Sequence, residues 1–336
     1  MRRRVAGRSA RRPKSRLLDN FSLNVPSPAT RPASIARRSR EGYNGAVTSP
    51  PSSPRDASPV LDGLLSLLTC PETGQPLSGW NGTDRTGTLS TACGRTYPVE
   101  DGIPNLLPDA LRFPDPEAPA EEVLEKQHEM EARDAQVVDY DRMVGLKLFT
   151  SVELPLTLRF LDTGAGHVML EGGCGTGRMT TAFAQRVDAL VCVDFSRESL
   201  KVAQAKLPTE LRHKVVFLQA DLSQLPLRAD SFDRVGSFGV YEHIPTAETR
   251  AGALRHLARV CKGAADGGRF AISAYRWGPP VSWSSAKQGH HPGGIYFTRF
   301  TQDEFRADLE PCFDVAGMTE VLLYYHLMWG RRKANG

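Results

Sequence analysis

The sequence contains one stretch in which an acid precedes regularly spaced glycines. The apolar run 168–170 leads into Glu171, and the glycines of the following turn occupy alternate positions: Gly173, Gly175 and Gly177. Glycines let the backbone approach a ligand closely. The segment 178–187 predicts a helix, and a helix N-terminus favours a negatively charged group. A strand, a glycine turn and a helix start in this order are typical of a nucleotide-type pocket at the carboxyl end of a sheet.

The positions of the glycines argue against a dinucleotide cofactor. The dinucleotide fingerprint G-x-G-x-x-G needs a third glycine three residues after the second. Counted from Gly173 the third position is Arg178, and counted from Gly175 it is Thr180. A start one residue earlier also fails. The pattern that fits is acid-x-G-x-G-x-G, which begins at Glu171.

Acids also follow the next two predicted strands. Asp194 ends the apolar strand 189–193, where a carboxylate can accept both hydroxyls of a ribose; enzymes that bind NAD use an acid at the same place. Asp221 and Leu222 follow the next apolar strand. Together with the glycine pattern, these residues resemble the class I S-adenosylmethionine-dependent methyltransferases, in particular the UbiE-like and methyltransferase type 11-like members, over residues 135–333.

The resemblance implies S-adenosylmethionine as the cofactor. In the family, an acid at the position of Asp221 accepts a hydrogen bond from the adenine amino group, and an apolar neighbour such as Leu222 packs on the ring. Arg178 either reinforces binding of the cofactor carboxylate or faces solvent. The cofactor-binding residues that the resemblance implies are Glu171, Gly173, Gly175, Gly177, Asp194, Asp221 and Leu222.

A second group of candidate residues follows the fourth predicted strand. The run Tyr241-Glu242-His243 is similar to an apolar-flanked Glu-His pattern that UbiE-like and quinone O-methyltransferases carry at the mouth of the active site. His243 is a candidate general base, and Tyr241 is a second catalytic candidate; the alternative for His243 is a hydrogen bond that orders the loop. Some relatives bind a divalent metal with two acids and this histidine. The first acid would fall at Gly239, so the sequence predicts no metal site.

Strands and helices alternate around these residues. We expect an α/β fold with a Rossmann-like, doubly wound, mostly parallel seven-stranded sheet. The expected strands are 168–170, 189–193, 215–218, 233–238, 269–274, 313–318 and 322–329. The expected helices are 152–161, with Pro155 in its first turn, then 178–187, 196–206, 246–262 and 301–309. An aromatic insertion at 275–297 is expected to form a lid or binding loop, in which His290 and His291 either contact the substrate or lie exposed.

Residues 60–108 predict a small β-rich module. Its sequence resembles the zinc-ribbon-like module found beside, or fused to, many methyltransferases: an LLxxLxCP entry, two cysteine knuckles and a YPVxDGIPxLL exit. A structural zinc site needs about four ligands, usually from two Cys-x-x-Cys knuckles. Here Cys70 and Cys93 remain, and Thr73 and Ser90 replace their partners. Because hydroxyls are poor zinc ligands, the sequence predicts a module that binds no zinc.

The remaining segments are polar. Residues 1–59 are rich in Arg, Ser and Pro and predict a disordered basic tail; residues 109–134 predict a linker and a polar helix. Residues 1–60 hold 13 of the 42 Lys/Arg but three of the 38 acids, so the remainder carries six more acids than bases. That balance argues against nucleic-acid binding. No apolar run approaches the roughly 20 residues of a membrane span.

Six dispersed cysteines are typical of a reduced, cytoplasmic protein, although the Arg-rich, acid-poor start is also typical of an organelle transit peptide. The oligomeric state is left open. The expected function is methyl transfer from S-adenosylmethionine to an O, N or C nucleophile of a small molecule. An RNA or protein methyltransferase is the alternative, favoured by the module and the basic tail and disfavoured by the acidic body. A nicotinamide-dependent oxidoreductase and a non-catalytic binding protein with the same fold are weaker alternatives.

Overall fold

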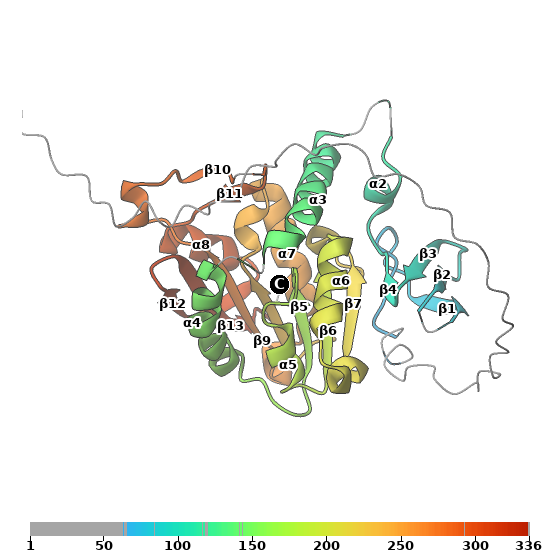
Figure 1. The fold of residues 1–336 in the computed structure, drawn as a ribbon. Helices are drawn as coiled ribbons and strands as arrows, with labels where there is room; N and C mark the ends of the chain where they lie inside the picture. Colours follow the sequence, from blue (N-terminus) through green and yellow to red (C-terminus); the bar gives the residue numbers. More distant parts are fainter. Residues whose placement is uncertain are drawn as a thin grey trace, which may run out of the picture.

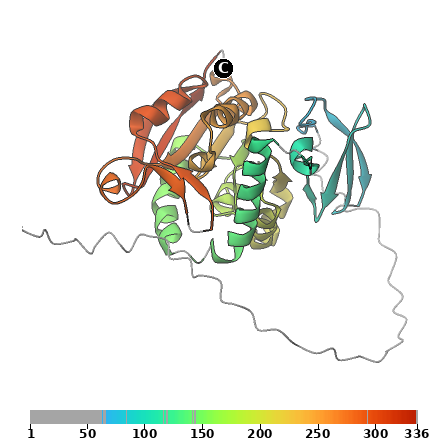
Figure 2. The ribbon, with the colours of Figure 1, turned by 90° about the horizontal axis from the view of Figure 1, so that it is seen from above.

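The structure, a computed structural model, describes residues 63, 66–83, 85–115, 117, 120–140, 142, 144–291 and 293–334, with side chains except at 138, 139 and 144–146. The predicted disordered tail, residues 1–59, lies outside these ranges. Within them the chain forms an α/β body and a small β-rich module at its side (Figures 1 and 2). None of the helices in the described ranges has the length and apolarity needed to cross a bilayer.

A seven-stranded, mostly parallel sheet forms the centre of the body, as predicted. Its strand order is β12-β13-β9-β8-β5-β6-β7. The five strands from β9 to β7 are parallel, and β13 is antiparallel to both β9 and β12. The strands are β5 (Val168–Gly172), β6 (Ala189–Asp194), β7 (Val215–Gln219), β8 (Arg234–Phe238), β9 (Arg269–Tyr275), β12 (Phe313–Val321) and β13 (Tyr325–Arg332).

Helices cover both faces of the sheet (Figure 1). On one face, Phe183 and Leu200 belong to the core cluster that contains Met169; on the other, Leu254 and Phe305 belong to the cluster that contains Leu170. The helices are α4 (Val144–Leu161), α5 (Thr180–Ala184), α6 (Arg197–Lys206), α7 (Ala247–Val260) and α8 (Gln302–Leu309). Short 3₁₀ turns occupy Thr209–Lys214, Leu222–Gln224, Tyr241–His243, Ala264–Asp266 and Val281–Trp283.

Two predicted helix boundaries were wrong. Helix α4 begins at Val144, so Pro155 lies inside it and not in its first turn. A proline in a helix interior leaves the carbonyl four residues earlier without its backbone partner; here that residue is Ser151, which is exposed, so water can satisfy the carbonyl. The helix expected at 178–187 is only the short α5, because the turn continues to Met179.

Helix α3 (Glu121–Tyr140) lies across the carboxyl ends of the parallel strands (Figure 1). The expected boundary between linker and methyltransferase domain, at 134/135, falls inside this continuous helix. The aromatic insertion also contains regular structure, a hairpin of β10 (Gln288–His290) and β11 (Tyr296–Thr298). Both elements border the carboxyl ends of the parallel strands, where a ligand site is expected for this fold.

The N-terminal module is a four-stranded antiparallel sheet in the order β1-β2-β3-β4. Its strands are β1 (Leu77–Gly82), β2 (Gly87–Thr91), β3 (Thr96–Glu100) and β4 (Ile103–Pro104), and helix α2 (Asp109–Arg112) follows. Leu89, Tyr97 and Val99 are fully buried. Residues of the module and of the body belong to one hydrophobic cluster, so the two share a core.

Hydrogen bonds to backbone carbonyls attach the module to the edge of the large sheet. The Leu106 N–H donates to the carbonyl of Gln219, the last residue of β7, at 2.8 Å. The Thr69 N–H donates to the carbonyl of Pro226 at 2.9 Å. Arg197, in the first turn of α6, donates to the Glu100 carbonyl at 2.9 Å. The module therefore covers an edge strand that would otherwise expose unpaired backbone groups.

Candidate functional site

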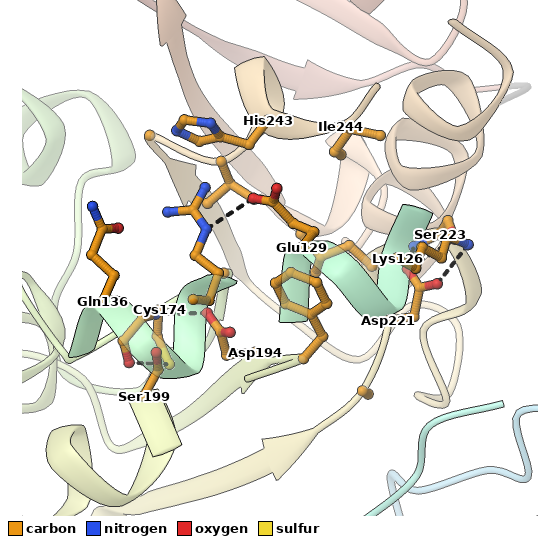
Figure 3. Close-up of a pocket in the computed structure, with 18 of the residues that line it drawn as sticks. Lys126, Glu129, Gln136, Cys174, Asp194, Ser199, Asp221, Ser223, His243 and Ile244 are labelled. Carbon is orange, nitrogen blue, oxygen red and sulfur yellow. Dashed lines mark hydrogen bonds and ion pairs between the residues drawn. The ribbon is translucent and has the colours of Figure 1, made fainter. Parts of the chain in front are cut away.

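A pocket lies at the carboxyl ends of β5, β6, β7 and β8, beneath helix α3 (Figure 3). One wall is the glycine turn, from Gly173 to Thr176 together with Arg178. The turns after β6, β7 and β8 contribute Asp194, Asp221, Leu222, Gly239 and His243. The site thus brings together most of the residues singled out in the sequence, and it follows the general rule that open α/β sheets bind ligands outside the carboxyl ends of their strands.

Each of the three alternating positions favours glycine for a different structural reason. All have positive φ, +71° at Gly173, +53° at Gly175 and +80° at Gly177. A Cβ at Gly173 would lie 2.3 Å from a methyl group of Val240, and one at Gly177 would lie 3.0 Å from the Cβ of Ala203. No atom lies within 4 Å of a Cβ at Gly175. Gly175 therefore borders open space in the pocket, whereas Gly177 packs against α6 and is not among the lining residues.

Asp194 connects the end of β6 to the glycine turn. Its Oδ2 accepts a hydrogen bond from the Gly175 N–H at 2.8 Å, and its Oδ1 accepts one from the Ser196 N–H at 2.9 Å. Burial raises the pKa of Asp194 above its usual value. The carboxylate still lines the pocket and keeps free lone pairs, since each oxygen can accept more than one hydrogen bond.

Glu171 lies behind the turn and is not among the residues that line the pocket. It is buried, and its Oε2 accepts a hydrogen bond from the Thr180 hydroxyl at 2.7 Å. Burial raises its pKa to about 7. In this structure Glu171 joins β5 to the start of α5 and so supports the turn from below.

The acid expected to contact adenine is paired with a lysine. Oδ2 of Asp221 lies 2.8 Å from Nζ of Lys126 in α3, and its Oδ1 accepts a hydrogen bond from the Ser223 N–H at 2.8 Å. Burial alone would lower the pKa of Lys126, but the attraction of Asp221 raises it above its ordinary value. Leu222 lines the pocket beside this pair.

Sequence reasoning missed the contribution of helix α3. Its pocket-facing residues are Glu122, Glu125, Lys126, Glu129, Arg133, Gln136, Val137 and Tyr140. Arg133 pairs with Glu129 at 2.9 Å (Figure 3). The sequence signal was a polar helical stretch, which also fits a solvent-exposed linker helix. Only the folded chain identifies the strand ends that this helix crosses.

The two catalytic candidates lie apart. His243 lines the pocket, and its Nδ1 lies 2.6 Å from the carbonyl oxygen of Tyr296 in β11. Because a carbonyl can only accept, Nδ1 donates and the neutral ring keeps its lone pair on Nε2. Burial, with the positive charge of Arg133, holds the pKa of His243 well below its usual range. Tyr241 is outside the pocket lining, and its hydroxyl donates to Asp308 at 2.8 Å.

For three further residues, the sequence left two interpretations open. Arg178 lines the pocket, is largely buried, and pairs with the fully buried Glu153 at 2.8 Å, so it does not face solvent. His291 is partly buried, and its ring centroid lies 5.9 Å from that of His243, whereas His290 is exposed. Across the described ranges, three His, Cys, Asp or Glu side chains do not come together at any point that could hold a metal.

Comparison with known proteins identifies the class. A family model described as "Methyltransferase domain", of type 11, matches residues 170–272, and one described as "Trm112p-like protein" matches residues 62–102. The chain is 37% identical over 115 residues to methyltransferase GfsG of Streptomyces halstedii, covering 34% of this chain and 39% of that protein. It is 37% identical over 126 residues to a demethylmenaquinone methyltransferase of Clavibacter sepedonicus, covering 37% and 47%.

The chain thus spans less than half the length of these curated relatives. Among solved structures, the 1,6-didemethyltoxoflavin-N1-methyltransferase of Burkholderia thailandensis has the same fold, with a TM-score of 0.50 and 17% identity, over 76% of this chain and 100% of that one. The α/β body is therefore a class I S-adenosylmethionine-dependent methyltransferase domain. More particularly, residues 170–272 of this body match the type 11 methyltransferase model, and the N-terminal module that precedes it is Trm112p-like over residues 62–102.

S-adenosylmethionine is the cofactor of this class, and the pocket fits it. Strands β7, β6, β5 and β8 are neighbours in that order. Asp221, Asp194 and the glycine turn follow the first three of them, so they form a row along one pocket. The open space at Gly175 leaves room for a ligand at the glycine-turn end of this row.

Proposed function

We propose that this protein transfers the methyl group of S-adenosylmethionine to an oxygen, nitrogen or carbon nucleophile of a small-molecule acceptor. The row of Asp221, Asp194 and the glycine turn carries the proposal, because its order matches the adenine, ribose and amino-acid parts of the cofactor. We assign the adenine to Asp221 and Leu222, the ribose to Asp194, and the amino-acid end to the turn at Gly173 and Gly175, with Glu171 and Gly177 supporting that turn from outside the pocket.

The chemistry needs little from the protein beyond positioning. When bound, the cofactor supplies a methyl group on a positively charged sulfur, and the sulfur leaves as a neutral thioether. Holding the nucleophile in line with the breaking bond supplies about 7–11 kcal/mol of the rate enhancement. We propose His243 as the base for acceptors that must lose a proton, since its neutral ring presents Nε2 once Nδ1 donates to Tyr296.

A small-molecule acceptor is supported by the acidic body and by relatives. Relatives with 37% and 38% identity over part of their length are named as methyltransferases of demethylmenaquinone and of magnesium-protoporphyrin. The alternative is an RNA or protein acceptor; a mouse protein named as a probable tRNA methyltransferase is 32% identical over 124 residues. RNA binding that disappears when residues 1–59 are deleted would favour this alternative through the basic tail.

We propose that the Trm112p-like module is zinc-free and supports the methyltransferase domain from the edge of its sheet. The thiol of Cys70 lies 2.9 Å from the Tyr97 hydroxyl, and that of Cys93 lies 3.1 Å from the Thr91 hydroxyl. Stoichiometric zinc by elemental analysis would contradict this. The dispersed, free cysteines support a cytoplasmic location.

Calorimetry tests the central proposal. Titration with S-adenosylmethionine should release heat with a one-to-one stoichiometry, whereas NAD should give none. Absence of binding by S-adenosylmethionine would overturn the proposal. Tritium transfer from the labelled cofactor into a small-molecule extract, followed by mass spectrometry, would then identify the acceptor.

A further inference from the structure

A buried carboxyl group lies directly beneath the pocket and has no partner. Glu242 is fully buried, and neither of its side-chain oxygens has a hydrogen-bond partner in another described residue. Leaving a buried carboxyl unpaired costs free energy. The unpaired state of Glu242 therefore needs an explanation, and neither the proposed cofactor contacts nor the proposed base involves this residue.

The position of Glu242 relates it to the floor of the pocket. Gly239 lines the pocket with φ +72°, and a Cβ there would lie 3.8 Å from Oε1 of Glu242. This Cβ position on Gly239 would also lie 3.9 Å from Nη2 of Arg178 and 3.7 Å from the hydroxyl of Tyr325. Three polar groups therefore converge beneath a residue that lacks a side chain, and the bare glycine brings a ligand close to them.

The surrounding charges leave Glu242 without a counter-ion. Arg178 is paired with Glu153 of α4 at 2.8 Å, and Arg133 of α3 is paired with Glu129 at 2.9 Å. His243 Nε2 lies 3.9 Å away on the same turn, and its ring is neutral. The phenols of Tyr275 in β9 and Tyr325 in β13 also lie within electrostatic range of Glu242 and carry no charge. Burial and the negative charge of Glu153 raise the pKa of Glu242 to about 8, so the empty pocket holds it mostly protonated at neutral pH.

The order of the strands indicates which positive charge comes to it. Adenine is assigned beside β7 and ribose beside β6, so the amino-acid end of the cofactor must lie beside β5 and β8. Gly239 directly follows β8, and its neighbour Val240 is in contact range of Gly173 in the glycine turn. The end of the cofactor that carries the α-ammonium therefore lies over the floor that covers Glu242.

We propose that Glu242 is the counter-charge for the α-ammonium group of the cofactor, and that it releases its proton to solvent when the cofactor binds. This inference rests on the proposed function. It makes Glu242 a residue that couples cofactor affinity to pH. A neutral carboxyl in the empty site avoids a buried unpaired charge, and the ammonium stabilises the ionised form only when the site is filled.

Two ligands of known structure separate this role from a structural one. S-adenosylhomocysteine carries the amino-acid arm, whereas 5′-methylthioadenosine has the same adenine, ribose and thioether without it. Glu242→Gln should weaken S-adenosylhomocysteine roughly 10- to 100-fold, as expected for a hydrogen bond between charged groups, and should leave 5′-methylthioadenosine within about twofold. Glu242→Asp should recover part of the loss. Glu320→Gln, a carboxylate paired with Arg276 and outside the pocket lining, is the matched control and should change neither affinity.

The wild-type protein supplies an independent test that needs no variant. The affinity for S-adenosylhomocysteine should rise about tenfold per pH unit up to pH 8 and then level off, while that for 5′-methylthioadenosine stays flat. Calorimetry at pH 7 in buffers of different ionisation enthalpy should show the release of close to one proton, which Glu242→Gln abolishes.

An equal loss of both ligands in Glu242→Gln, or parallel pH profiles for the two ligands in the wild type, would overturn the role of Glu242. Failure of the wild type to bind either ligand would instead overturn the proposed cofactor site.

Discussion

The ammonium group of Lys126 in helix α3 lies 2.8 Å from Oδ2 of Asp221, the acid assigned to the adenine amino group. The second oxygen of Asp221 already accepts hydrogen bonds from the backbone and hydroxyl of Ser223. The lysine therefore contacts the oxygen of Asp221 that Ser223 leaves free, which is the oxygen proposed to face the adenine amino group. We expect cofactor binding and the attachment of α3 to the strand ends to compete for this carboxylate, because Lys126 and the adenine amino group would share one oxygen.

Replacing Lys126 should consequently strengthen cofactor binding. Lys126→Met keeps most of the length of the unbranched side chain and removes the competing charge. We expect S-adenosylhomocysteine to bind about three- to tenfold more tightly, corresponding to ~1 kcal/mol for a partly buried ion pair, as measured by calorimetry. Lys201→Met, which removes an exposed lysine paired with Glu198, should leave the affinity unchanged. Weaker binding by Lys126→Met would mean that the lysine closes α3 over the ligand and does not compete with it.

His243 should affect turnover and spare cofactor binding. If it takes the proton of the acceptor, His243→Ala should lower methyl transfer by about 10²–10⁴-fold, the usual contribution of a general base, with the affinity for S-adenosylhomocysteine unchanged. Tritium transfer from labelled cofactor into a small-molecule extract measures the first quantity. Tyr241→Phe is the comparison, because its hydroxyl bonds Asp308 outside the pocket lining and should not limit turnover. Near-normal methyl transfer by His243→Ala would limit the role of His243 to ordering the loop through its hydrogen bond with Tyr296.

Glu171 should make the protein less stable as the pH rises. Its folded-state pKa is raised to about 7 from an ordinary value of 4.5, so between these values the folded chain binds more protons than the unfolded chain. Stability from this group is present below pH 4.5 and is lost as the pH approaches 7, by roughly 3 kcal/mol in total. Glu171→Gln imitates the protonated acid, so it should raise the free energy of unfolding at pH 8 and have little effect at pH 4.5. Denaturant titration at both pH values provides the measurement, and equal effects at the two would contradict the assignment.

The shared core of module and body predicts that they unfold together. Leu106 is fully buried and its backbone is bonded to β7. Leu106→Ala should lower the free energy of unfolding by about 2–5 kcal/mol, the range for a buried leucine, within a single denaturant transition of the full chain. Leu124→Ala, at a leucine that is 38% exposed, should cost much less. Two separate transitions, with only the smaller one shifted by Leu106→Ala, would show that the module unfolds independently.

Much of the fold was predictable because its signals are local. The apolar runs of β5, β6 and β7 are continuous, since parallel strands covered on both faces have no polar side. Ser196, Thr246 and Thr301 cap their helices as such residues usually do. By contrast, the polar sequence of α3 and the interior position of Pro155 in α4 carry no clear local signal, because tertiary packing determines where both helices run.

The sequence by itself determined the class of the cofactor loop. The alternation of Gly173, Gly175 and Gly177 after Glu171, and the acids Asp194 and Asp221 at or just after the ends of the next two strands, depend on spacing along the chain. Spacing is fully visible in a sequence.

Only the tertiary structure decided how those residues are used. It paired Asp221 with Lys126, placed Glu171 behind the turn, and directed His243 toward the pocket and Tyr241 away from it. It also left Glu242 buried and unpaired beneath Gly239. The physical reason is that each of these outcomes depends on contacts between distant segments, such as His243 with Tyr296, 53 positions apart, which exist only after the strands and helices have packed.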